Sequence, residues 1–333
     1  MSARALLTRL CLGPATTREL TRDLSLDASA VSAGFDWLRE AGVAIVDSGA
    51  TGFALAQPMQ LLDRGEILAA MPAGSRAQVA SLSVAFETNS TQADALAEPT
   101  PPGGCAVFLA ERQTAGQGRR GRTWASPLAA NLYMSISRRF PGGLAALSGL
   151  SLVVGIAVAE ALNAQLSLIQ GKAGNDSNAS RIGVKWPNDL VAEGKKLGGI
   201  LVQLRSDAGA GTQAVIGIGI NVRMPESHAA QIDQAWCDLS DLDGGMLSRN
   251  ALVAALLDAL LPALMQFEHE GLSPFLPRWR RLDALADKPV RVLDGPAVHE
   301  GVSLGITESG ALRVRQGAQE RSFHSGEVSL RPA

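Results

Sequence analysis

The chain has 333 residues, 46% of them hydrophobic and 19% charged, so it is long enough for two or three folded domains and too apolar for an intrinsically disordered protein. Thirty Lys and Arg residues against 32 Asp and Glu residues give a net charge of −2. This balance excludes a surface that attracts nucleic acid or anionic membrane as a whole, so any anion must be bound by a local group of cations.

Cysteine usage and the N-terminus indicate the compartment. Cys11, Cys105 and Cys237 form no CxxC pair, which argues against a disulfide framework and against a zinc site and fits a reducing cytoplasm. The N-terminus lacks a secretory signal pattern, and the longest apolar-rich stretch, residues 144–162, contains Gly, Ser and Glu. The sequence therefore predicts a soluble cytoplasmic protein with no membrane partner.

Residues 1–63 predict a small DNA-binding domain. Thr16 and either Asp27 or Ser29 are expected to cap the second and third of three short helices. The helices are expected at 2–12, 16–24 and 27–42, and a hairpin at 43–46 and 53–55. Three helices and a hairpin are typical of a winged helix-turn-helix, and a small helical interaction domain is the alternative.

The third predicted helix is the candidate recognition helix. It offers the hydroxyls of Ser29 and Ser32 but no Lys or Arg in residues 28–34, so Arg18 and Arg22 are expected to supply phosphate contacts. The lack of cationic residues on this helix argues against tight DNA binding.

Residues 64–284 predict a mixed α/β domain, which a linker at 57–65 precedes. Neighbouring strands are expected to meet in hairpins, and residues 171–180 to form an exposed polar loop. Strands are expected at 82–86, 106–110, 132–137, 183–185, 196–205 and 215–222, and long helices at 145–166 and 250–270.

Residues 285–333 predict a small β-barrel, which completes an α+β protein. Short alternating segments separated by Gly-containing turns are expected to form its strands. These segments are 289–293, 298–306, 311–315 and 322–330.

The stretch GQGRRG at 116–121 matches GxGxxG, the dinucleotide-binding fingerprint. That fingerprint needs a helix to begin at the loop, whereas a strand-like segment follows at 132–136, and no GxxxxGK[ST] phosphate loop occurs. Glycines still let backbone N–H groups approach a ligand, guanidinium groups pair with carboxylate or phosphate, and Trp124 can stack on a purine. A solvated basic loop is the alternative.

A second candidate stretch is KWPND at 185–189. Pro187 forces Trp186 to be extended, so Lys185 ends a strand and can stabilise a transferring phosphoryl group. Asp189 is a candidate partner for a metal or for the cations, and an ordinary solvent-facing lysine is the alternative for Lys185.

A third candidate is the strand at 216–222, on which Gly217, Gly219 and Asn221 share one face. Glycine weakens a strand, so two on one face indicate close approach by a ligand or another backbone. A helix crowding the glycine face is an equal alternative.

Two further patterns carry little weight. GVSLG at 301–305 fits GxSxG, but it lies among short β segments, whereas a nucleophile elbow needs a strand that turns into a helix. The histidines lack HExxH spacing, so metal binding is not expected at His228, His269, His299 or His324.

The chain resembles biotin protein ligases in five motifs: QTAGQGRRGRTWASP, NLYMSIS, VKWPNDL, KKLGGILVQL and VIGIGINV. The N-terminal domain and the QPMQLL linker extend the resemblance to the bifunctional form, which is both ligase and biotin operon repressor. The resemblance implies the biotin/lipoate ligase catalytic fold, an SH3-like C-terminal barrel, and ATP, biotin and Mg²⁺ at the site. It implies that biotin and ATP form biotinoyl-5′-AMP, and that a lysine of the biotin carboxyl carrier protein of acetyl-CoA carboxylase then takes the biotinoyl group.

The resemblance also implies residue roles, with Lys185 and Arg119 as catalytic residues and Asp189 as a candidate metal ligand. A polar loop at 223–236 is expected to order over the adenylate, and a homodimer to form through the catalytic sheet. The implied biotin contacts are Ser90, Thr91, Gln113, Gly116, Arg119, Arg122, Lys185 and Gly199. The implied nucleotide contacts are Trp124, Asn131, Lys196, Asn221 and Trp236.

Departures from the family pattern leave alternatives open. Asn89-Ser90-Thr91-Gln92 stands where Asp-Ser-Thr-Asn is common, Gln117 stands where an arginine is frequent, and the loop at 171–180 is longer than usual. Because Gln117 is uncharged, the loop has one cation fewer than is frequent in the family, which argues against tight retention of the adenylate. The alternatives are a repressor that keeps the adenylate pocket and a ligase for lipoate or another acyl group.

Overall fold

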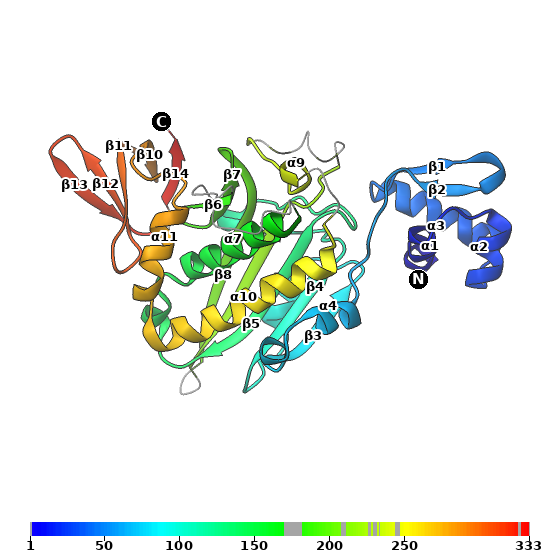
Figure 1. Cartoon of the computed structure of the whole chain (residues 1–333), viewed down its shortest axis with the longest axis horizontal. Coiled ribbons are helices and arrows are strands. Elements are labelled where there is room, and N and C mark those ends of the chain that lie inside the picture. The colour runs from blue at the N-terminus through cyan, green and yellow to red at the C-terminus, as the bar shows by residue number, and fades with distance from the viewer. Residues whose placement is uncertain are drawn as a thin grey trace.

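The computed structural model has three parts in chain order, with the N-terminal part at one end and the C-terminal sheet at the other (Figure 1). The loop predicted at 171–180 lies outside the described residues. The described residues are 2–169, 182–207, 211–225, 228, 232, 234–243, 247–325 and 328–332.

The N-terminal part has the predicted three helices and hairpin. Thr16 caps the second helix in a capping box with Glu19, and the Asp27 side chain caps the third by accepting from the Ala30 N–H at 2.7 Å. Its elements are α1 (Ser2–Cys11), α2 (Thr17–Leu24), α3 (Ala28–Glu40), β1 (Ile45–Asp47) and β2 (Phe53–Leu55), the strands being antiparallel.

The core of the N-terminal part continues into the central part of the chain, residues 64–284. Leu128 and Ala129 belong to the same buried cluster as Leu6 and Phe35. The ring of Trp37 on α3 lies 5.7 Å from that of Phe86. The N-terminal part therefore packs against the central part through apolar contacts.

A seven-stranded sheet forms the central part, in the order β3-β4-β5-β9-β8-β7-β6. Among the described strands β3 and β4 are parallel and the other pairs are antiparallel. The pairs β4–β5 and β8–β9 confirm the predicted pairing of neighbours, whereas β6 and β8 are separated by β7. Asp189 begins a strand that the sequence did not predict. The strands are β3 (Val79–Ala85), β4 (Cys105–Ala110), β5 (Leu132–Phe140), β6 (Ile182–Lys185), β7 (Asp189–Ala192), β8 (Lys195–Asp207) and β9 (Gly211–Ile220).

Two long apolar helices, α7 (Leu150–Ile169) and α10 (Arg249–Glu270), pack together on one face of the sheet (Figure 1). By length and composition either could cross a membrane, but 61% of the most apolar window of each is buried in the protein, as in the core helices of a globular domain. Their side chains share the main core with Met134 and Ile136 of β5.

The opposite face of the sheet carries α6 (Thr91–Ala97), which contacts β4, β5 and β9. Ser135 points to this face, because successive strand residues alternate between faces and Met134 and Ile136 point to the core. The remaining short helices are α4 (Arg64–Ala70), α5 (Ala73–Arg76), η1 (Gly49–Thr51), η2 (Arg119–Gly121), η3 (Leu144–Leu147), α9 (Ser240–Asp243) and η4 (Ser273–Phe275).

The C-terminal part is a five-stranded antiparallel sheet, reached through α11 (Leu276–Leu282), in the order β13-β12-β11-β10-β14. In the described residues β13 and β14 are edge strands that do not pair, so the predicted closed barrel is not formed. Alternating residues and Gly turns predict strands, whereas closure depends on strand tilt and stagger. The strands are β10 (Pro289–Asp294), β11 (Ala297–Ile306), β12 (Leu312–Gln316), β13 (Gln319–Phe323) and β14 (Val328–Pro332).

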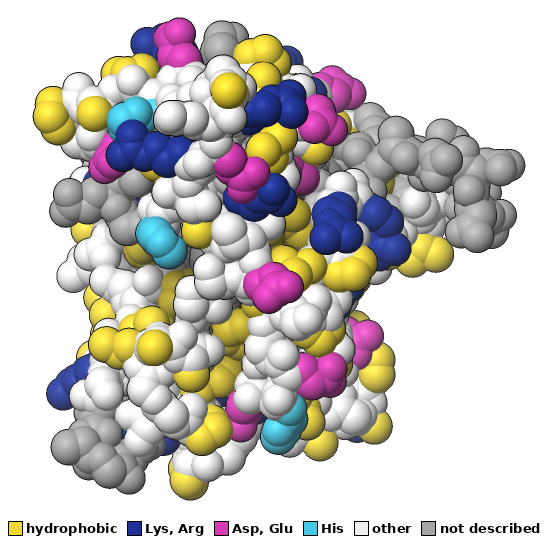
Figure 2. Space-filling model, turned by 90° about the vertical axis from the view of Figure 1, so that its left-hand side faces the viewer, with side chains coloured by type: hydrophobic (Ala, Val, Ile, Leu, Met, Phe, Trp, Pro, Cys, Tyr) yellow, Lys and Arg dark blue, Asp and Glu magenta, His cyan; other side chains and the backbone are white. Residues whose placement is uncertain are grey.

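The surface on the side of the C-terminal sheet has mixed charge. Figure 2 shows Lys and Arg side chains mainly in the upper half of this face, with Asp and Glu side chains among them. Arg313 pairs with Glu320 at 2.6 Å, and Arg291 with Glu300 at 3.4 Å. Among the described residues of this face, charges of both signs are therefore interspersed.

Candidate active site

A cavity of about 150 Å³ lies on the sheet face that carries α6. Its walls come from the start of α6, the loop 113–124, strands β5, β8 and β9, the turn 185–189 and strand β14. The predicted site residues that line it are Ser90, Thr91, Gln113, Arg119, Arg122, Trp124, Lys185, Asp189, Lys196 and Gly199.

One end of the cavity is polar and uncharged. The Thr91 backbone N–H donates to Oε1 of Gln113 at 2.9 Å, and the Gln113 amide donates to Oγ of Ser126 at 3.0 Å. The Thr91 hydroxyl lies 2.9 Å from that of Ser135 on β5. This end offers fixed hydroxyl and amide groups to a polar, uncharged ligand group.

The opposite wall is cationic. Asp189 Oδ2 lies 2.8 Å from Nζ of Lys185, and Asp189 Oδ1 lies 2.9 Å from Nζ of Lys196. Burial opposes ionisation of Asp189, but the two ammonium groups outweigh it and lower the pKa of this carboxyl. The three side chains form a fixed cluster with an excess of positive charge at the cavity wall.

The arginine loop meets this cluster. The Arg119 guanidinium donates to Oδ1 of Asn188 at 3.0 Å and to the Ser325 carbonyl in the C-terminal part. Burial, together with the charge of neighbouring Arg120, lowers the pKa of Arg119. The structure therefore brings the loop, the KWPND turn and the C-terminal part to one side of the cavity.

No α-helix begins after GQGRRG. The turn η2 (Arg119–Gly121) is followed by extended residues that lead to β5. The loop consequently lacks the helix N-terminus that a dinucleotide-binding fingerprint requires.

Trp124 lies against the glycine face of the sheet. A Cβ added to Gly219 would be 2.5 Å from the Trp124 ring, and one added to Gly199 would be 3.4 Å from it. A Cβ on Gly217 would instead meet Oε1 of Gln92, on α6, at 2.6 Å. Gly217 therefore fits the alternative in which a helix crowds this face. Gly219 makes room for a side chain of the loop, and close approach by a ligand stays a prediction.

The indole ring of Trp124 is arranged for stacking. The ammonium of Lys196 lies 5.4 Å from its centroid. Within the described part of the chain, the buried Nε1 of Trp124 has no hydrogen-bond partner. A flat ligand group and an acceptor atom would satisfy the ring and its N–H.

Some predicted site residues lie outside the cavity lining. Gly116 is at the loop base, where a Cβ would come 2.6 Å from the Trp124 carbonyl. Asn131 is fully buried and accepts from the Val222 N–H at 2.9 Å, while Asn221 donates to the Cys237 carbonyl at 3.1 Å. Trp236 forms a backbone bridge with Lys196. None of these four residues lines the cavity.

The described residues do not fit a metal held by the protein. Asp189 is the only carboxylate among the described cavity residues, and both its oxygens face ammonium groups. No group of three His, Cys, Asp or Glu side chains in the described chain could hold an ion.

Sequence reasoning missed several cavity residues. Ser135 was detectable, because it faces away from Met134 and Ile136 on an alternating strand. Gln92 also lines the cavity and accepts from the Ser135 hydroxyl at 3.1 Å. Leu330 and Arg331 of β14 carry no local signal, because only the tertiary fold brings the C-terminal part to the site.

Comparison with known proteins agrees with this arrangement. Residues 85–221 match the Biotin/lipoate A/B protein ligase family, and residues 286–331 match the Biotin protein ligase C terminal domain. The Bifunctional ligase/repressor BirA of Escherichia coli is 40% identical over 95% of this chain and 92% of its own length. The Biotin--[acetyl-CoA-carboxylase] ligase of Paracoccus denitrificans is 34% identical over 72% of this chain and 97% of its own.

A solved structure resembles the fold as well. The biotin protein ligase from Aquifex aeolicus in complex with biotin and ATP has a TM-score of 0.63 and 26% identity, covering 76% of this chain and all of that one. Because the Escherichia coli relative is 40% identical over 95% of this chain, the chain belongs to the biotin protein ligase family.

Proposed function

We propose that this ligase activates biotin with ATP as biotinoyl-5′-AMP and transfers the biotinoyl group to one lysine of a biotin carboxyl carrier protein. The observation that carries the proposal is a cavity that combines an uncharged polar end, a cationic wall and the indole ring of Trp124. These surfaces suit the polar rings of biotin, the reacting carboxylate and phosphate, and the adenine. A related ligase named for acetyl-CoA carboxylase and a similar structure with biotin and ATP support it.

The chemistry creates negative charge where the cations lie. A biotin carboxylate oxygen attacks the α-phosphorus of ATP, and the bond to pyrophosphate breaks with its electron pair. The carrier amine then attacks the acyl carbon, loses a proton and displaces AMP. Lys185, held by Asp189, stabilises the phosphoryl oxygens without reorganising, and Arg119 holds the carboxylate and then the acyl phosphate.

The other roles follow from position. Ser90, Thr91 and Gln113 bind the biotin rings. Arg122 and Gly199 line the same space, Lys196 faces the nucleotide and Trp124 stacks on the adenine. Mg²⁺ is expected to arrive bound to the ATP phosphates, because Asp189, the only carboxylate among the described cavity residues, faces two ammonium groups.

Intact-mass measurement tests the activity. Incubation with biotin, ATP, Mg²⁺ and a carrier domain should add one biotinoyl group to a single carrier lysine. A carrier that gains no mass here, but is modified by an active ligase, would refute the proposal. Competition by lipoate distinguishes a lipoate ligase, which the family description also covers.

Gly219→Ala should raise the KM for ATP roughly tenfold, since overpacking of this size typically costs 1–3 kcal/mol. The added methyl would meet the Trp124 ring and displace it from the sheet. Steady-state kinetics and tryptophan fluorescence measure the effect. Gly74→Ala is the control, because a Cβ there meets nothing within 4 Å. Equal KM values in the two variants would show that Trp124 does not form the adenine site.

We also propose that the chain is a biotin-responsive repressor whose N-terminal part is a winged helix-turn-helix. Ser29, Ser32, Arg18 and Arg22 are exposed, although Arg22 pairs with Asp23 at 2.8 Å. Similarity to a ligase/repressor over 95% of the chain supports this second role. Biotin and ATP should strengthen binding to DNA from its own operon, and binding no tighter than to random DNA would remove the role.

The organisation proposed with these functions has units at 1–63, 64–284 and 285–333, the last an open variant of an SH3-like barrel. The family match at 286–331 supports the last boundary. A homodimer of the liganded protein and a cytoplasmic location, where ATP is available, complete the proposal.

A further inference from the structure

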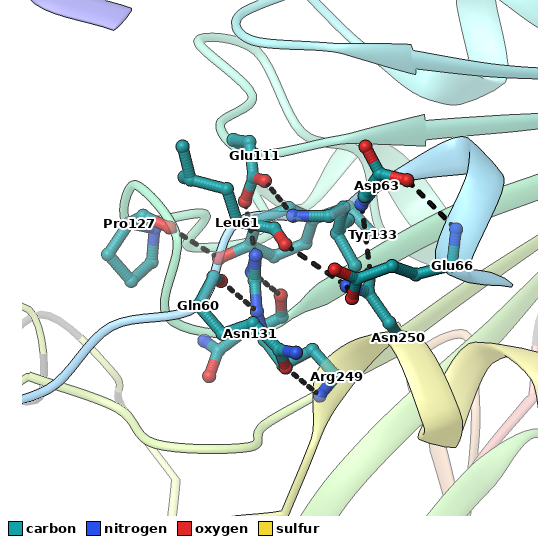
Figure 3. A network of polar contacts seen from close by, with 11 residues as sticks. Gln60, Leu61, Asp63, Glu66, Glu111, Pro127, Asn131, Tyr133, Arg249 and Asn250 are labelled. Carbon is teal, nitrogen blue, oxygen red and sulfur yellow. Dashed lines mark hydrogen bonds and ion pairs between the residues drawn. The ribbon is translucent and has the colours of Figure 1, made fainter. Parts of the chain in front are cut away.

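A buried polar network lies where the linker meets the start of α10 (Figure 3). The Arg249 guanidinium is at its centre, with 4% of the residue exposed. It donates to the Gln60 carbonyl at 3.2 Å and the Asn131 carbonyl at 3.0 Å, and it pairs with Glu111. The second Glu111 oxygen accepts from the Leu62 N–H. One cation thus joins the linker, β4 and the residue before β5.

Asn131 carries this network to the segment that follows β9. Its Oδ1 accepts from the Val222 N–H at 2.9 Å, and the preceding Ala130 carbonyl accepts from the Arg223 N–H at 3.2 Å. Farther along the same segment, Gln234 lines the cavity. The peptide that Arg249 holds therefore determines where this segment leaves the sheet.

The segment is also fastened at its base. Asn221 donates to the Cys237 carbonyl at 3.1 Å, and Asp238 accepts from the Met224 N–H at 2.8 Å. Both bonds lie beside β8, because the Lys196 N–H donates to the Ala235 carbonyl at 3.0 Å and the Cys237 N–H donates to the Lys196 carbonyl at 3.0 Å. A shift at Asn131 therefore reaches the backbone of Lys196, whose side chain lines the cavity.

We propose that Arg249 is a positioning residue for the nucleotide half of the site, acting through Asn131 on residues 222–224. The inference rests on the proposed ligase function. Neither Arg249 nor Asn131 lines the cavity. Arg249 instead lines a separate small pocket together with Gln60 and Val222. Their loss alters ATP use and leaves biotin use nearly unchanged, because Ser90, Thr91 and Gln113 are held by separate bonds.

Arg249→Met and Asn131→Ala test the proposal. Each should raise the KM for ATP about tenfold while the KM for biotin changes less than about twofold, the loss expected when a fixed geometry is relaxed. Arg249→Met leaves Glu111 buried without its partner and can unfold the chain, whereas Asn131→Ala keeps that ion pair. The double variant should have the same ATP KM as the more impaired single variant, because both act along one path.

Arg138→Met is the matched control. Arg138 also ties α10 to the sheet, through Glu268 at 2.7 Å, but at the opposite end of the helix. It should leave the ATP KM unchanged even if it lowers the unfolding temperature. Arg249→Lys, which can keep the Glu111 pair, should recover part of the ATP KM.

The outcomes separate the two claims. Wild-type protein without biotin-dependent pyrophosphate release would overturn the ligase function and this inference with it. An active wild type would overturn the inference alone if folded Asn131→Ala kept its ATP KM. The same holds if the biotin and ATP KM values rose together, or if Arg138→Met raised the ATP KM equally.

Discussion

Lys185→Ala is expected to lower the rate of biotin adenylation by about 100-fold or more, the size of effect seen when one preorganised group that stabilises transition-state charge is removed. The Lys185 ammonium is held 2.8 Å from Asp189 at the cavity wall, with only 13% of its side chain exposed. A cation that is already placed and largely shielded from water stabilises the phosphoryl oxygens more than a mobile one. Single-turnover release of pyrophosphate measures this step directly.

Lys195→Ala is the control for this loss of charge. Lys195 is an exposed neighbour on β8 that does not line the cavity, so the variant should keep the wild-type rate. Lys185→Ala should lower kcat more than it raises the KM for biotin, because the charge appears mainly in the transition state. An unchanged single-turnover rate would leave Lys185 with a structural role only.

Local sequence signals predicted much of the fold. Thr16 and Asp27 begin helices because their side chains cap free N–H groups, a property of a few neighbouring residues. Alternating residues are also a local signal, and they predicted the antiparallel pairs β4–β5 and β8–β9 but not the short strand β7. Closure of the C-terminal sheet was predicted wrongly, because strand length and turn residues do not encode the relative tilt of β13 and β14.

The site was predictable where a residue type has few other uses. Glycine at 219 and the run of arginines at 119–122 are costly or unusual unless something approaches them closely. Gln92 and Arg331 could not be assigned without the fold, since glutamine and arginine are common on any surface. Asn131 shows that a motif can also suggest a contact that is not formed. It begins the NLYMSIS motif and was expected to contact the nucleotide, but its side chain accepts from the Val222 N–H and does not line the cavity.

The nature of the KWPND turn also depended on tertiary context. Pro187 predicted that Lys185 ends a strand, which it does. The partner of Lys185 is Asp189 at the start of β7, and Lys196 joins from β8 through the next hairpin. Asp189, a candidate metal ligand in the sequence, is therefore the anion that holds Lys185 and Lys196 in place.

Arg119→Ala is expected to release the adenylate about 100-fold faster, because charge-assisted hydrogen bonds are typically worth 1.5–3 kcal/mol each. Arg119 lines the cavity and is held in place by Asn188 and by the Ser325 carbonyl, so the wild-type loop keeps a cation beside the acyl phosphate. Freed biotinoyl-5′-AMP should then modify exposed lysines of an unrelated protein such as serum albumin, which immunoblotting for biotin detects.

Arg112→Ala is the matched control for that experiment, since Arg112 pairs with Glu87 at 2.8 Å and does not line the cavity. Arg112→Ala and the wild-type protein should both leave albumin unlabelled. Labelling by the wild type would instead indicate that Gln117, in place of a cation, already weakens retention of the adenylate. Gln117→Arg separates these cases, because an added cation at the cavity wall should slow release only if charge limits it. If Arg119→Ala protein retained its adenylate as long as the wild type, Arg119 would not be the residue that retains it. Lys185 and Lys196 would then be the cations that hold the adenylate.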